Sequence, residues 1–140
     1  MTRLLVIIAV AFVLVSAVFG WMLRTYLPGA TVTDILFEMT LSLDLLALLI
    51  LLTMVFGAVG GFKRDIASVH VATILTVAFG VLGAVAGEYN THFGVLFDNV
   101  VTFATLAPLR LESLAMLALG LFGALPGLSI LHLQGGVRRD

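Results

Sequence analysis

The chain has 140 residues, of which 61% are hydrophobic and 11% are charged, and its mean hydropathy is +1.22. Soluble domains carry roughly 25% charged residues, so an ordinary soluble domain is excluded. The net charge of -1 argues against nucleic-acid binding, which needs a concentrated basic face, and the absence of cysteine excludes disulfides and thiolate metal sites.

Four apolar stretches are long enough to cross a bilayer core of about 30 Å as helices. They predict an all-α, integral membrane four-helix bundle in one domain over residues 1–140, with spans at about 4–27, 41–61, 66–87 and 108–132. The first stretch begins like a signal peptide, but it is longer than the usual apolar core of about 7–15 residues. We therefore expect a retained span that ends at Pro28 and Gly29.

Acidic residues lie at the beginning of the second span. Thr31 and Asp34 have capping-box spacing, which predicts a helix that starts here and continues into the span. Asp44 lies a few residues inside the apolar run. Either it belongs to a solvated helix entrance, or it faces a bundle interior or a water-filled cavity, as carboxylates inside membranes usually do.

A stripe of polar and small residues runs down one side of the third span. Its members recur at steps of three and four: His70, Thr73, Thr76, Gly80, Gly83 and Gly87. Such a stripe packs against another helix or lines a narrow pore, and membrane threonines often bond their own backbone. His70 lies close to the basic turn at Lys63 and Arg64, which favours an interfacial position. No metal site or cofactor is expected.

The connection between the third and fourth spans also has a helical pattern. Its apolar residues are spaced as on one helix face: Phe93, Leu96, Phe97, Val100, Val101 and Ala104. The pattern predicts a short amphipathic helix in this outer loop, lying on the membrane surface or against the bundle.

The fourth span contains most of the specific information. Ala107 and Pro108 indicate a helix start, with Pro108 in the first turn. Glu112 follows, as a solvated helix-start carboxylate or as a group that faces the interior of an assembly. Small or slender residues then line one face: Ser113, Met116, Gly120, Gly123 and Gly127. Bare faces in lipid allow close packing, so we expect this face to pack on the glycines of the third span.

The basic residues predict the orientation. With four spans, both termini and the turn at Lys63 and Arg64 share one side, which collects Arg3, Lys63, Arg64, Arg138 and Arg139. The other side has Arg24 and Arg110. The positive-inside rule then puts both termini in the cytoplasm, for a multi-pass protein of the cell inner membrane.

Two segments resemble the last two membrane helices of the MotA/TolQ/ExbB proton-channel family. Residues 80–87, GVLGAVAG, are similar to the family's glycine-rich segment. Residues 107–126 resemble a second family segment, in which an Ala-Pro pair is followed by a glutamate and then by Ala-x-Gly-Leu; Glu112 is at the position of the glutamate. The resemblance implies a ring-forming subunit that packs around a single-span partner helix, and Glu112 is the one polar family residue retained. Together with Thr73 and Thr76 of the stripe and the carboxylate of Asp44, it makes up the ion-path or partner-contact candidates. Ala84 and Leu117 stand where the family carries threonines that face the proton path.

Three classes of function remain open. The chain is a ring-forming subunit, a non-catalytic accessory or assembly subunit of a larger membrane complex, or a small autonomous transporter. Compact four-helix exporters typically carry a carboxylate deep in the first span, and residues 4–19 contain none. An enzyme is not expected, because no nucleophile-base pair, metal cluster or phosphate loop is evident.

Overall fold

A computed structural model describes residues 2–37, 39–97 and 102–136. Its elements are α1 (Thr2–Tyr26), α2 (Val32–Phe37), α3 (Leu41–Phe62), α4 (Ile66–Phe97) and α5 (Phe103–Gly136). The described chain has no strand, and α1, α3, α4 and α5 are each long and apolar enough to cross a membrane. The prediction of an all-α chain with four candidate spans is therefore confirmed.

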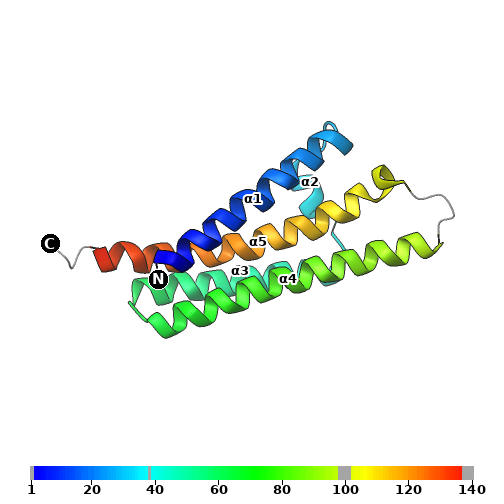
Figure 1. Ribbon diagram of the computed structural model, residues 1–140. Coiled ribbons are helices and arrows are strands. Elements are labelled where there is room, and N and C mark those ends of the chain that lie inside the picture. The colour runs from blue at the N-terminus through cyan, green and yellow to red at the C-terminus, as the bar shows by residue number, and fades with distance from the viewer. Residues whose placement is uncertain (1, 38, 98–101, 137–140) are drawn as a thin grey trace.

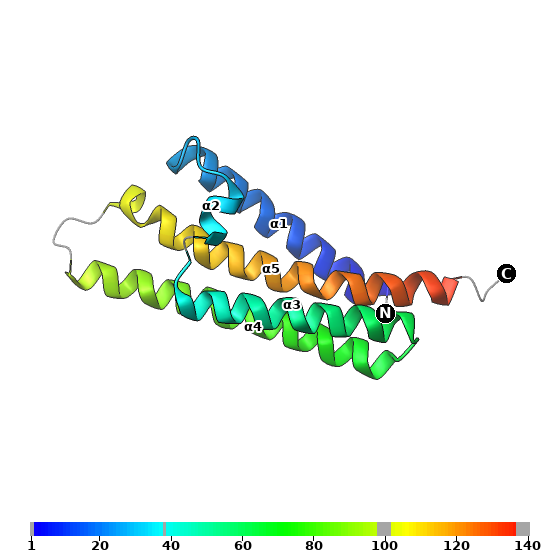
Figure 2. The same cartoon turned by 180° about the vertical axis from the view of Figure 1, so that it is seen from behind.

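Helix α5 is the centre of the bundle. It packs against α3 and α4, which also pack on each other, and these three helices form a compact unit (Figures 1 and 2). Helix α1 packs chiefly on α5, and it diverges from α5 toward its own C-terminal end (Figure 1). Grooves remain on both sides of the contact between α1 and α5.

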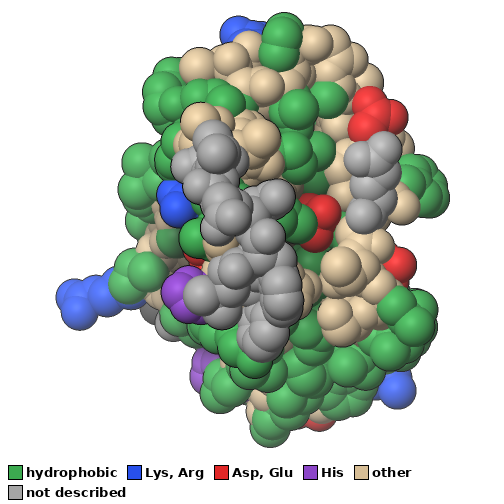
Figure 3. Space-filling view, turned by 90° about the vertical axis from the view of Figure 1, so that its right-hand side faces the viewer, with side chains coloured by type: hydrophobic (Ala, Val, Ile, Leu, Met, Phe, Trp, Pro, Cys, Tyr) green, Lys and Arg blue, Asp and Glu red, His purple; other side chains and the backbone are tan. Residues whose placement is uncertain are grey.

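The start of α1, the turn between α3 and α4, and the C-terminal part of α5 lie at one end of the bundle (Figure 1). Thr2 Oγ1 lies 3.4 Å from His132 Nδ1, and Arg64 Nε donates to Gln134 Oε1 at 3.1 Å. We call this the basic end, because Arg3, Lys63 and Arg64 are there. Figure 3 views the opposite end, where acidic side chains lie apart from one another among apolar ones, with a few basic side chains and histidines also in view.

The capping box before α2 is confirmed, but the predicted continuation into α3 is wrong. Thr31 N donates to Asp34 Oδ2 at 2.7 Å, and Asp34 N donates to Thr31 Oγ1 at 3.3 Å. The helix nevertheless ends at Phe37, and Thr40 has extended backbone before α3 begins. The change of direction lays α2 on α5, where Ile35 is buried in the same cluster as Phe19 of α1.

The ends of α4 and α5 differ from those expected. Within the described part of the outer loop there is no separate amphipathic helix: residues 88–97 continue α4, and residues 98–101 lie outside the described residues. A spacing of three and four residues fits continuation of an existing helix equally well. At 1.5 Å per residue, the 32 residues of α4 extend about 48 Å, well beyond an apolar core of about 30 Å.

Helix α5 begins five residues before Pro108, which therefore lies inside the helix and not in its first turn. Thr102 and Thr105 cap this earlier start: Thr102 N donates to Thr105 Oγ1 at 3.0 Å. Because proline has no N–H, the hydrogen bond from position 108 to the carbonyl oxygen of Ala104 is missing from the helix.

Asp65 caps the start of α4. Its Oδ1 accepts from Ala67 N at 3.1 Å and from Ser68 N at 3.2 Å, and its Oδ2 accepts from the Ser68 hydroxyl. The hydrogen bonds from the side chain and backbone of Ser68 lower the pKa of the Asp65 carboxyl. The anion is therefore the form that stabilises this turn.

Candidate functional site

Helices α4 and α5 approach most closely at Gly80 and Gly120. A Cβ atom on Gly80 would lie 2.7 Å from Gly120 Cα, and one on Gly120 would lie 2.6 Å from Gly80 Cα. No side chain fits at this crossing, so the two backbones are in direct contact. Toward the opposite end the same seam continues, with Gly83 against Met116 and Gly87 against Ser113.

The remaining small residues of α5 contact α3. A Cβ atom on Gly123 would lie 3.0 Å from Ile50 Cγ2, and one on Gly127 would lie 2.7 Å from the Gly57 carbonyl oxygen. The small-residue face of α5 thus contacts α4 from Ser113 to Gly120 and contacts α3 at Gly123 and Gly127. The sequence predicted one face for the third span alone, whereas Gly57 and Gly61 of α3 also meet it, at Gly127.

Thr73 and Thr76 are both buried, and both hydroxyls bond to their own helix. Thr73 Oγ1 donates to Val69 O at 2.8 Å, and Thr76 Oγ1 donates to Ala72 O at 3.0 Å. The methyl group of Thr76 faces Gly123, inside the compact unit of α3, α4 and α5. Within this chain both hydroxyls therefore donate hydrogen bonds to backbone carbonyl oxygens of α4.

Glu112 and Asp44 occupy contrasting environments near the opposite end. Glu112 is only 8% exposed and lies between buried Leu111 and Ser113. Asp44 is exposed, although the preceding Leu43 is fully buried. The guanidinium of Arg110 lies 4.7 Å from the centroid of the Phe103 ring, on the same helix.

The four candidate polar residues do not form one site within the chain. The Thr76 carbonyl oxygen contacts α5 at Gly120, eight residues beyond Glu112. That separation is about 12 Å along the helix axis. In the described residues, no group of three or more His, Asp and Glu side chains is arranged to hold a metal ion.

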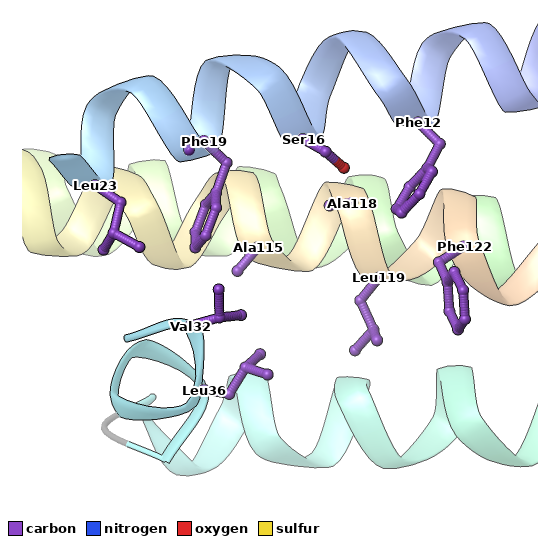
Figure 4. Close-up of a pocket in the computed structure, with 11 residues that line it drawn as sticks. Phe12, Ser16, Phe19, Leu23, Val32, Leu36, Ala115, Ala118, Leu119 and Phe122 are labelled. Carbon is purple, nitrogen blue, oxygen red and sulfur yellow. The ribbon is translucent and has the colours of Figure 1, made fainter. Parts of the chain in front are cut away.

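Two apolar grooves flank α1, and the sequence reasoning missed both. The first has a volume of about 360 Å³ and lies between α1, α2 and α5; Figure 4 shows Phe12, Phe19 and Phe122 around it and the Ser16 hydroxyl directed into it. The second, of about 470 Å³, lies between α1 and α4 and includes His70 and Thr73. The positions of the grooves depend on the angle at which α1 diverges from α5. The spacing of apolar residues along a helix does not encode that angle.

A scan against models of protein families, a search of curated proteins and a search of solved structures found no match to the chain. The buried carboxylate of Glu112, the glycine seam and the two grooves are thus the features from which a function is inferred.

Proposed function

We propose that the chain is a ring-forming subunit of a proton-driven, energy-transducing membrane complex, in which several copies pack around a partner transmembrane helix. The observation that carries this proposal is Glu112, a carboxylate only 8% exposed within a candidate span. Carboxylates in such positions are costly and mark functional contacts by default. Glu112 is also the glutamate of the segment that resembles the MotA/TolQ/ExbB family.

The packing of α4 on α5 supports the same proposal. These helices carry the two segments of the resemblance, and they lie side by side through the contact of Gly80 with Gly120. In this proposal Glu112 meets a basic or protonatable group on a neighbouring copy or on the partner helix.

We further propose that the chain supplies the wall of the path and that the partner supplies the proton-carrying group. The hydroxyls of Thr73 and Thr76 bond their own backbone. Ala84 and Leu117 are apolar at the positions where the family has threonines. A partner with a transmembrane aspartate would then complete the path. We place the basic end in the cytoplasm, with the protein in the inner membrane.

A second candidate is a non-catalytic accessory or assembly subunit of a larger membrane complex. It is favoured by the use of the glycine stripe inside the chain, since Gly80, Gly83 and Gly87 all contact α5. A stripe occupied in this way does not line a pore by itself. The two candidates differ in stoichiometry and in the role of Glu112.

The test compares Glu112→Gln with Glu88→Gln and Asp98→Asn, two substitutions that remove carboxylates of the connection between the third and fourth spans. Each variant is assayed for co-purification with a single-span partner encoded nearby and for complementation of a deletion strain. We expect Glu112→Gln alone to weaken assembly or activity. If all three variants behave like the unsubstituted protein, Glu112 is an interfacial charge and the ring proposal loses its support.

A further inference from the structure

The second groove lies between α1 and α4, with α5 beneath it, and it opens beside the basic end. Leu4, Ile7 and Ala11 form one wall, Ile74 and Val77 form the other, and Leu121 of α5 lies between them. His70 is on the α4 wall and is exposed. The groove is therefore apolar along its length and polar at one end.

The length of the groove distinguishes a lipid chain from a protein helix. The α4 wall extends from His70 to Val77, seven residues or about 10 Å along the axis. One leaflet of the apolar core is about 15 Å thick, whereas a spanning helix would need a groove of about 30 Å. The groove thus fits the upper part of one acyl chain within a single leaflet.

The charges near the groove favour an anionic headgroup. Arg3 lines a shallow surface beside the groove together with Ile7, which belongs to both and follows Arg3 by one helical turn. Lys63 and Arg64 are on the turn that precedes α4 and outnumber Asp65 there. A phosphate at this level accepts hydrogen bonds from an Arg guanidinium and an imidazole N–H.

We propose that this groove is a binding site for an anionic phospholipid of the leaflet at the basic end. One acyl chain lies between α1 and α4, and the phosphate meets Arg3 and His70. Basic pockets between transmembrane helices recognise anionic headgroups by the same combination of charge and apolar contact. The bound lipid fills the space between α1 and α4 above Leu121 of α5.

Native mass spectrometry of the full chain, delipidated and then given equal amounts of dioleoyl phosphatidylglycerol and dioleoyl phosphatidylcholine, tests the headgroup. The two lipids have identical chains. We expect phosphatidylglycerol to be favoured about fivefold for each basic side chain that contacts it. Arg3→Gln with His70→Gln should bring the ratio to about one, while Arg24→Gln, at the other end of α1, should leave it unchanged.

Filling the groove tests the position of the chain. Ile74 and Leu82 are 68% and 55% exposed on α4, so tryptophan at either position leaves helix packing intact, but only Ile74 lines the groove. Ile74→Trp should lower occupancy by both lipids, and Leu82→Trp should not. Equal binding of the two lipids, equal effects of Arg3 and Arg24 substitutions, or equal effects of the two tryptophans would overturn the proposal. A dimer that Ile74→Trp abolishes would assign the groove to a second copy instead.

Discussion

Replacing Gly120 by alanine should separate α4 from α5. The new Cβ atom would lie 2.6 Å from Gly80 Cα, 2.7 Å from the Thr76 carbonyl oxygen and 3.0 Å from Gly80 N. All three are backbone atoms of a helix, so none can rotate away as a side chain does. To restore ordinary contacts near 3.5 Å, the helices must move apart by about 1 Å.

The cost follows from two opposing terms. Overpacking of a tight site costs about 1–3 kcal/mol. Alanine is the better helix former by about 1 kcal/mol, which offsets part of that cost. We therefore expect Gly120→Ala to destabilise the bundle by about 1–2 kcal/mol, because the separation also loosens the neighbouring contact of Gly83 with Met116.

Gly20→Ala provides the matched control. Gly20 is also in a long helix, but a Cβ atom there would have nothing within 4 Å, so we expect a neutral or slightly stabilising effect. Thermal unfolding in mild detergent, followed by size-exclusion chromatography of heated samples, should give a lower midpoint for Gly120→Ala alone. Equal midpoints for the two variants would refute direct backbone contact between α4 and α5.

Three further predictions concern the seam, the cap and the orientation. Gly83→Leu should lower the same midpoint, at a cost of about 1–3 kcal/mol, because a Cβ atom at Gly83 would already lie 2.9 Å from Met116 Cβ. An unchanged midpoint for Gly83→Leu would contradict the seam. The pKa of Asp65 is lower in the folded chain, so the stability that its cap contributes should be present above the unfolded pKa and should fall as the pH drops through the folded value. Unfolding midpoints measured between about pH 3 and 7 should show this fall, and Asp65→Asn should abolish it. Single cysteines at exposed Pro28 and Lys63, in a chain that otherwise has none, should label from the outside and from the cytoplasm respectively, and the reverse would overturn the orientation.

Much of the fold could be predicted because each candidate membrane-spanning helix corresponds to a long apolar run in the sequence. The second span, expected at 41–61, is α3 at Leu41–Phe62, because Thr40 and Lys63 bound a run in which the only charged residue is Asp44. The extent of α4 could not be predicted in this way, since polar residues such as Glu88 continue the helix beyond the apolar core. The break at Thr40 depends on burying Ile35 against other helices, and no local signal encodes it.

For the candidate site, the recurrence of small residues at steps of three and four predicted which faces pack, but it did not predict which residues of two helices contact each other. Gly80 lies opposite Gly120, and Gly127 lies opposite Gly57. Both contacts depend on how far each helix is shifted along its neighbour, which is set by the packing of the whole helices. The burial of Glu112 likewise depends on its rotation within α5. The grooves beside α1 arise from the angle at which that helix leaves α5.

The proposed function is tested most directly by the native mass of the complex. The full chain is purified in mild detergent together with any single-span partner encoded beside it, and the mass gives the number of copies. A ring of several copies around one partner helix, disrupted by Glu112→Gln and preserved in Glu88→Gln, is the predicted result. One copy bound to a large complex, with the same mass in both variants, would contradict the ring and favour the accessory role.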